Sequence, residues 1–327
     1  MKILLLGGNG FGKVHAESYQ RLKREFSVFD RKESVLKFYE DNFNVANTFS
    51  NLENALNSTY DVVDIVLPHN LHYYSALKAI NRKKHVILEK PIATNLTDAT
   101  SLITASRESH VKFMVAEQYF FDSSIRLVRD LLSKGIIGKV KTVIVRDQRF
   151  YKNQGWRINE SMMGGGALID GGIHYIETIL DIGGEYSQIL AHVYKGGSQL
   201  EGEDNAIALF SFASGSHGIL FYSWSYNYPP ILPSYEIIGT NGSIVEDVNS
   251  KPKVDFKFQN FPRHAFGFPI LNGSLKTIAV DDIFDSEIES FLRSIEEDIE
   301  VPYRPELAMR NLDTVLRIYG KQLGLKK

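Results

Sequence analysis

The 327-residue sequence contains no cysteine. This absence excludes disulfide bonds, thiolate metal sites and cysteine nucleophiles, and it fits a reducing compartment. The sequence also lacks any apolar run near the roughly 18 residues that cross a bilayer. Gly7 and Gly8 end the run from Ile3 to Leu6 too early for a secretion signal. We therefore expect a cytoplasmic protein with no membrane partner.

Neither sign of charge is in excess, because 37 Lys and Arg residues face 39 Asp and Glu residues and no run of like charge stands out. This balance gives no reason to expect a nucleic-acid partner. The apolar and charged fractions, 43% and 23%, are those of an ordinary globular chain. Since a single core stops growing at roughly 250 to 300 residues, the length predicts two domains and a small-molecule ligand.

Short apolar runs alternate with helix-compatible stretches through about Glu117, as in βαβ units with a parallel sheet. Strands are expected at residues 3–6, 27–29, 62–67, 86–88 and 113–115. Helices are expected at residues 12–23, 33–39, 71–81 and 96–106, the last capped by Asn95 or Thr94. The predicted fold class of residues 1–121 is α/β, an N-terminal Rossmann domain with a doubly wound parallel sheet.

The pattern changes after a helix expected at residues 123–133. Longer strands are expected at residues 140–149, 206–212, 218–226 and 235–238. Ala213 to Ser216 and Asn241-Gly242 are hairpin signals, which indicate mainly antiparallel pairing. Residues 122–327 therefore predict an α+β domain with a large, mainly antiparallel open sheet. Helices are expected at residues 283–295 and 305–319, and the last is placed to pack back on the N-terminal domain.

A glycine-rich turn, Gly7-Gly8-Asn9-Gly10-Phe11-Gly12, follows the first strand and opens a helix. In this context glycines let the backbone approach a pyrophosphate, and the helix N-terminus attracts its charge. Asn9 stands where a second glycine is usual, and it tolerates left-handed backbone better than most residues. Asp30, at the end of the second strand, favours the ribose hydroxyls of NAD, whereas Arg31 leaves NADP open.

Two further motifs carry reactive side chains. Glu89-Lys90-Pro91 directly follows a strand, at the sheet edge where open α/β folds bind ligands. In the stretch from Gly164 to His174, three glycines lead into a helix that carries Asp170 and His174 on one face. A carboxylate one turn from an imidazole suits proton transfer near neutral pH. Gly171 and Gly172 in this helix predict a close approach to the backbone by a nicotinamide ring or a substrate.

In this order and spacing the motifs resemble the Gfo/Idh/MocA family of oxidoreductases, over nearly the whole chain. The resemblance rests on the turn ending Gly12-Lys13-Val14-His15, on Pro68-His69-Asn70-Leu71-His72, on Glu89-Lys90-Pro91, and on the helix with Asp170 and His174. It implies a cis bond before Pro91 and an NAD(P)-dependent enzyme that oxidises a hydroxyl carbon of a sugar, polyol or related compound. His174 would then accept the hydroxyl proton with help from Lys90.

The resemblance and the motifs together name the site residues. The catalytic residues are expected to be Lys90, Asp170 and His174. The residues expected to bind the cofactor, NAD with NADP possible, are Gly7, Gly8, Asn9, Gly10, Phe11, Gly12, Asp30, Arg31, Leu67, Pro68, His69, His72, Glu89, Lys90 and Gln118. The residues expected to bind the substrate are Lys90, Tyr119, Arg157, Asp170 and His174, and no metal site is expected.

The sequence departs from the family pattern in two places. His69 replaces the usual Asn, and residues 117–121 lack the Arg that many relatives carry nearby. Aromatic residues alternate along the later strands, such as Phe210, Phe212, Tyr222 and Trp224, as a sheet face or an oligomer interface would require. The resemblance implies that another subunit covers this face, in a homodimer or homotetramer.

Two other functions stay open at this point. One is a lyase or glycosidase that keeps NAD tightly bound and oxidises its substrate only transiently. The other is a non-enzymatic sensor of cofactor or sugar. The joint presence of Lys90, Asp170 and His174 favours an enzyme.

Overall fold

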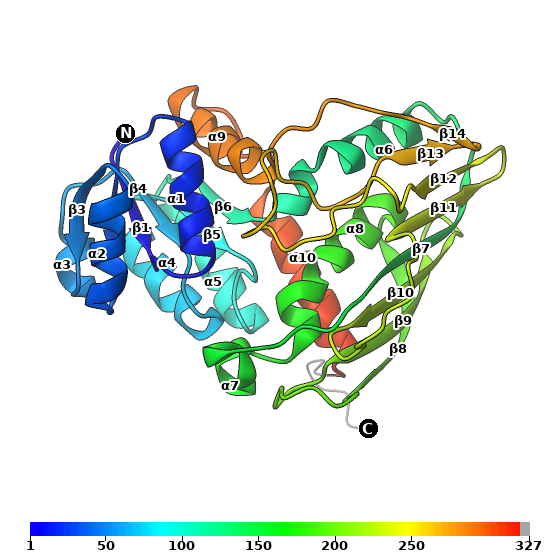
Figure 1. Ribbon diagram of the computed structural model, residues 1–327, viewed down its shortest axis with the longest axis horizontal. Coiled ribbons are helices and arrows are strands. Elements are labelled where there is room, and N and C mark those ends of the chain that lie inside the picture. The colour runs from blue at the N-terminus through cyan, green and yellow to red at the C-terminus, as the bar shows by residue number, and fades with distance from the viewer. Residues whose placement is uncertain (321–327) are drawn as a thin grey trace. The chain divides into compact units, whose positions relative to one another are not determined.

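The computed structural model describes residues 1–320 as two units, each built around one sheet (Figure 1). Unit 1 contains residues 1–118, 256–259 and 282–309. Unit 2 contains residues 119–255 and 260–281 and the chain from Arg310 onward. The boundary expected after residue 121 thus falls after Gln118 instead, and two later segments return to unit 1.

Unit 1 holds a six-stranded parallel sheet in the order β3-β2-β1-β4-β5-β6, which is the Rossmann order. Its strands are β1 (Ile3–Leu6), β2 (Phe26–Phe29), β3 (Val45–Phe49), β4 (Val62–Ile65), β5 (His85–Glu89) and β6 (Phe113–Ala116). Every residue of β1, β4 and β6 is buried, as expected of parallel strands that are covered on both faces. The predicted doubly wound parallel sheet is confirmed.

Helices connect these strands. They are α1 (Phe11–Arg21), α2 (Glu33–Asn42), α3 (Leu52–Leu56), the short 3₁₀ turn η1 (His69–Leu71), α4 (His72–Asn81), α5 (Leu96–Glu108) and α9 (Ile283–Glu296). Because the sheet order reverses between β1 and β4, right-handed crossovers put α1 and α4 on opposite faces. The side chain of Asn95 accepts a hydrogen bond from the Asp98 amide at 2.9 Å, which confirms the predicted cap of α5.

Unit 2 holds an eight-stranded sheet in the order β14-β13-β12-β11-β7-β10-β9-β8. Its strands are β7 (Val140–Gln148), β8 (Tyr186–Tyr194), β9 (Asn205–Phe212), β10 (His217–Ser223), β11 (Tyr235–Gly239), β12 (Ser243–Glu246), β13 (Pro269–Leu271) and β14 (Ser274–Leu275). Only the β7–β10 pair is parallel among the described strands of this sheet. The predicted large, mainly antiparallel sheet and its two hairpins are confirmed.

One face of this sheet is covered by helices of unit 2 (Figure 1). The helical elements are η2 (Gln118–Phe121), α6 (Ser123–Ser133), η3 (Gly155–Ile158), α7 (Glu160–Met163), η4 (Leu168–Gly172), α8 (Ile173–Gly183) and α10 (Pro305–Ile318), although η2 and α10 each begin in unit 1. Helix α8 packs on β7 and β10, and Phe210, Phe212, Tyr222 and Trp224 are all at most 5% exposed. The expectation that a second subunit covers these aromatic side chains is therefore wrong, because the unit's own helices cover them.

The opposite face of the sheet carries aliphatic side chains in solvent. Leu190 pairs with Leu209, and Leu209 pairs with Ile219 on the next strand. Their side chains are 61%, 49% and 37% exposed. Together with Ile207, which is also exposed, they form a solvent-exposed apolar patch on this face. No helix among residues 1–320 is both long enough and apolar enough to span a membrane.

Candidate cofactor and substrate sites

The glycine turn of unit 1 is shaped by contacts that leave no room for a side chain. A Cβ atom on Gly7 would lie 2.2 Å from the Val66 carbonyl oxygen, and one on Gly12 would lie 1.9 Å from that of Gly7. Gly7 and Gly10 have positive φ angles of 101° and 62°, which glycine adopts without strain. The turn therefore brings bare backbone against the start of α1, where a helix dipole attracts a pyrophosphate.

The end of β2 lies beside this turn. The Asp30 carboxylate accepts hydrogen bonds from the Gly8 amide at 3.1 Å and from the Lys32 amide at 2.9 Å. Asn9 orients the turn as well, since its side-chain oxygen accepts from the Gly10 amide at 2.9 Å. This arrangement fits an adenosine ribose next to Asp30, with the pyrophosphate on the glycines.

Gln118 provides a second sign of a ligand in unit 1. Its side chain is 1% exposed, and its Oε1 atom has no hydrogen-bond partner among the described residues. Buried amide oxygens are usually satisfied, so Gln118 fits a site that a bound molecule completes. A nicotinamide cofactor, when bound, supplies the hydride-accepting carbon, and these residues would hold it.

Lys90 follows β5, and the Lys90–Pro91 bond is cis, as the resemblance implies. The ring nitrogens of His72 lie 2.8 Å from the carbonyl oxygens of Pro91 and Leu67. Burial, followed by the neighbouring charge of His69, lowers the pKa of His72 to about 4. The ring is then neutral at pH 7 and donates to one of these carbonyls. His72, which the sequence predicts to bind the cofactor, is 0% exposed, and its ring lies between these two carbonyls.

Asp170 and His174 lie in unit 2 on one continuous helical segment. Asp170 lies in a single turn of π-helix, η4, and His174 lies in the first turn of α8. Single turns of π-helix are rare in proteins, and those that occur often lie at functional sites. The Arg157 Nε donates to the Asp170 carboxylate at 2.6 Å. The rings of Tyr119 and His174 stack at 4.4 Å, so all four predicted unit 2 site residues belong to two contacting pairs.

Gly171 and Gly172 lack side chains for a reason other than the expected one. A Cβ atom on Gly171 would lie 2.1 Å from the Tyr222 hydroxyl oxygen, and one on Gly172 would lie 2.9 Å from the Tyr222 ring. The group that approaches this backbone is thus the protein's own sheet rather than a cofactor or substrate. Because these two residues are glycines, η4 packs directly on aromatic side chains of the sheet. This packing sets the distance between Asp170 and the sheet.

A partly buried carboxylate that anchors η4 was missed in the sequence. Glu203 accepts hydrogen bonds from the Leu168 amide and from the Tyr319 hydroxyl, both at 2.8 Å. Burial raises the pKa of Glu203 to about 7, against the opposing effect of these hydrogen bonds. Cβ atoms on Gly165 and Gly166 would lie 2.7 Å from the Tyr319 ring and 1.9 Å from the Glu203 carbonyl oxygen. The glycine run before η4 therefore exists for packing, and only its small residues hinted at this.

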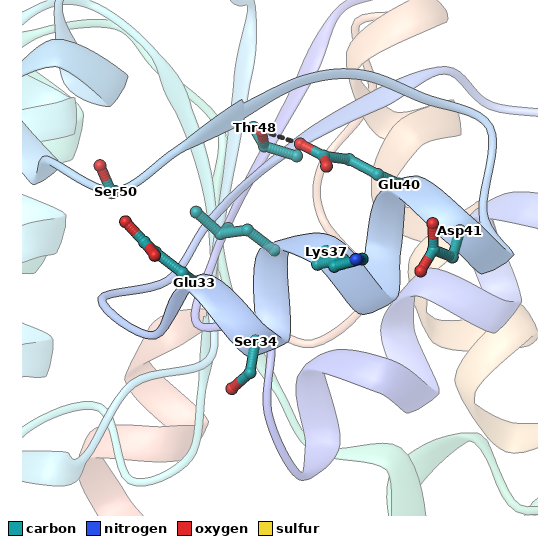
Figure 2. Close-up of a pocket in the computed structure, with 8 residues that line it drawn as sticks. Glu33, Ser34, Lys37, Glu40, Asp41, Thr48 and Ser50 are labelled. Atoms are coloured by element: carbon teal, nitrogen blue, oxygen red, sulfur yellow. Dashed lines mark hydrogen bonds between the residues drawn. The ribbon is translucent and has the colours of Figure 1, made fainter.

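A hollow of about 700 Å³ on unit 1 is lined by residues of α2 and by Thr48 and Ser50 (Figure 2). Its lining is polar and rich in carboxylates, and Figure 2 shows the Thr48 hydroxyl bonded to Glu40 at 2.7 Å. None of its residues belongs to a predicted site. We assign no ligand to it, because it is an open acidic surface.

Comparison with known proteins identifies both halves of the chain. Residues 1–117 match the model of the "Oxidoreductase family, NAD-binding Rossmann fold", and residues 125–245 match that of the "GFO/IDH/MocA C-terminal domain". Levoglucosan dehydrogenase of Pseudarthrobacter phenanthrenivorans is 24% identical over 307 residues, covering 82% of this chain and 79% of the relative. The NADP⁺-dependent scyllo-inositol 2-dehydrogenase of Bacillus subtilis is 26% identical, covering 91% and 89%.

Other comparisons extend this picture. The 2,7-anhydro-N-acetylneuraminate hydratase of Escherichia coli is 27% identical but covers only 58% of this chain and 52% of the relative. An oxidoreductase of Thermotoga maritima superposes with a TM-score of 0.84 at 23% identity, over 97% of this chain and 95% of that one. Levoglucosan dehydrogenase in complex with NADH and levoglucosan superposes with a TM-score of 0.82 at 21% identity, over 98% and 96%. With a matching model for the NAD-binding half and another for the C-terminal domain, the chain belongs to the Gfo/Idh/MocA family of NAD(P)-dependent oxidoreductases.

Proposed function

We propose that this enzyme transfers a hydride between NAD(P) and a hydroxyl-bearing carbon of a sugar, polyol or related compound. The observation that carries the proposal is the pair of contacts around η4, in which the Arg157 Nε donates to the Asp170 carboxylate and the Tyr119 ring stacks on the His174 ring. An imidazole held in place beside a carboxylate suits removal of a hydroxyl proton. The substrates in the names of the two dehydrogenase relatives, levoglucosan and scyllo-inositol, are hydroxyl-rich and uncharged.

In this proposal His174 accepts the proton of the reacting hydroxyl. Lys90 and Asp170 bind that hydroxyl or its neighbour, and Arg157 orients Asp170 and binds further substrate oxygens. Tyr119 keeps the His174 ring in one orientation by stacking on it. We propose NAD as the preferred cofactor because the Asp30 carboxylate repels a 2′-phosphate.

We further propose that the apolar patch on the unit 2 sheet (Leu190, Ile207, Leu209 and Ile219) joins copies of the chain into a homodimer or homotetramer in the cytoplasm. Exposed patches of this kind mark protein interfaces. Light scattering at micromolar concentration checks the assembly, and a monomer would contradict it.

The experiment that tests the function follows reduced cofactor by its absorbance. Purified protein is mixed with NAD⁺ or NADP⁺ in turn and with a panel of aldoses, polyols, inositols and anhydrosugars. A substrate-dependent rise is the expected result. If bound cofactor is present and no member of the panel gives a rise, the proposal is contradicted in favour of a lyase with transient oxidation, a reading that the hydratase relative supports, or of a sensor.

Two alanine variants test the proposed roles of Lys90 and His174. Lys90→Ala and His174→Ala should each lower kcat by about 10² or more, with NADH affinity nearly unchanged. Unchanged turnover in either variant would remove that residue from the chemistry.

A further inference from the structure

His15 lies on α1 in the interior of unit 1, away from solvent. It is 0% exposed, and each of its ring nitrogens faces a carboxylate. The Nδ1 atom lies 2.8 Å from Asp64 Oδ2 on β4, and the Nε2 atom lies 3.2 Å from Glu89 Oε1 at the end of β5. A neutral imidazole has one N–H group, so only the doubly protonated ring donates to both carboxylates.

The charges around His15 support this state. Burial alone would lower the pKa of His15, but the charges and hydrogen bonds of Asp64 and Glu89 outweigh burial and raise it well above 6.5. The Tyr19 hydroxyl also donates to Asp64 at 2.7 Å. His15 is therefore an imidazolium that crosslinks two strands and a helix. Within residues 1–320 no group of acidic or histidine side chains is arranged to hold a metal ion, so this cluster is not a metal site.

Helix α9 covers the cluster formed by His15, Asp64, Glu89 and Tyr19. It packs on α1 (Figure 1) and places the Phe284 ring 6.2 Å from the His15 ring. Glu287 of α9 is 0% exposed, and neither of its carboxyl oxygens has a hydrogen-bond partner within residues 1–320. Burial, followed by the negative charge of Glu89, raises the pKa of Glu287 well above 4.5. Burial in this cluster thus disfavours the charged form of Glu287.

The position of Glu89 connects this cluster to Lys90. Glu89 is the last residue of β5 and directly precedes Lys90. On the other side of Lys90, the carbonyl of Pro91 lies 2.8 Å from a ring nitrogen of His72. Two buried histidines thus bracket Lys90, one through the side chain before it and one through the backbone after it.

We propose that His15 is a positioning residue for Lys90, because its imidazolium bridges Asp64 and Glu89 and fixes the end of β5 from which Lys90 projects. This inference rests on the proposed function, in which Lys90 binds the reacting hydroxyl. Small displacements of such groups are costly, since about 1 Å of misplacement lowers turnover by about 10²-fold. His15 itself touches neither cofactor nor substrate in this role.

The first experiment needs no substrate. Long-range ¹H–¹⁵N spectra of the full chain at pH 8 should show both ring nitrogens of His15 protonated. A neutral ring at pH 7 would overturn the proposal. His15→Gln should shift the side-chain resonances of Lys90, whereas the matched control Tyr19→Phe, which also removes a contact to Asp64, should leave them in place.

The second experiment measures turnover against pH. His15→Gln should lower kcat by about 10- to 100-fold, with NADH affinity within about threefold of wild type and Tyr19→Phe close to wild type. Asp64→Asn keeps the acceptor oxygen but removes a charge, so the pKa of His15 falls and kcat/KM should decline with rising pH where wild type stays flat. The groups that face His15 in this titration are Asp64, Glu89, Glu287 and Tyr19.

Failure of this inference differs from failure of the function. If Lys90→Ala abolishes turnover while His15→Gln and Asp64→Asn match wild type at every pH, the positioning role is refuted and the function stands. If Lys90→Ala itself retains turnover, the proposed role of Lys90 is wrong, and the inference built on it falls too.

Discussion

Glu203 should make the stability of unit 2 depend on pH. In the folded chain the pKa of this carboxyl is about 7, against an ordinary value of 4.5, because burial penalises its ionised form. A raised carboxyl pKa gives stability that is complete below pH 4.5 and is lost as the pH rises through 7. The difference between the two pKa values corresponds to about 3 kcal/mol. Glu203 is partly exposed, so screening by solvent reduces the expected loss to about 2 kcal/mol.

The perturbation is Glu203→Gln, which cannot ionise. Gln keeps an Oε1 atom that can accept from the Leu168 amide and the Tyr319 hydroxyl, so the substitution should change stability by a similar amount at every pH, whereas the ionisation penalty disappears only in the variant. From pH 5 to pH 8, wild type should therefore lose about 2 kcal/mol of unfolding free energy relative to Glu203→Gln.

The assay is urea unfolding followed by tryptophan fluorescence. The chain has 2 tryptophans, and Trp156 and Trp224 both lie in unit 2, so the signal reports on the unit that contains Glu203. Glu201→Gln, a nearby exposed substitution of the same kind, is the matched control. If the stability difference between wild type and Glu203→Gln is the same at pH 5 and pH 8, the reasoning about the buried carboxyl is refuted.

Three further predictions concern the cofactor turn, the cofactor choice and the sheet face. Gly12→Ala places a methyl group 1.9 Å from a carbonyl oxygen and should abolish NADH binding in a fluorescence titration; retained affinity would contradict the close packing of the turn. Asp30→Ala should reduce the preference for NAD over NADP by about 10-fold in kcat/KM, and an unchanged ratio would mean that Asp30 does not select the cofactor. Leu209→Asp should shift the assembly toward monomer in light scattering, whereas the exposed control Ser187→Asp at the edge strand should not.

The sequence predicted the elements whose pattern is strongest. Strand β1 and helix α6 were predicted with their observed bounds. Strand β1 is a fully apolar run, and the structure adds that the Asp122 side chain caps α6. Strands β3 and β8 were missed. Both lie at the edge of a sheet and contain no buried residue, so they lack the apolar alternation on which prediction depends.

The candidate site was predicted in its residues but not in its supports. Asp170 and His174 stood out because their side-chain types suit proton transfer. Glu203 and Glu287 gave no such signal, because an acidic residue in a loop or in an amphipathic helix reads as solvent-exposed. Only long-range packing reveals that Glu287 is buried and that Glu203 is partly buried, and no local pattern encodes it.

The return of α9 to unit 1 also has a consequence for the order in which the protein can be made. The NAD-binding unit starts at the first residue but is completed only by residues 282–309. Until these emerge from the ribosome, α1 lacks the cover of Phe284 and the ion pairs from Arg21 to Asp285 and from Arg24 to Glu296. A nascent chain or a fragment ending at Gln118 therefore exposes an apolar helix face that invites aggregation. The cofactor-binding half thus takes its final shape only after residues 282–309 are translated, although most of its residues are synthesised earlier.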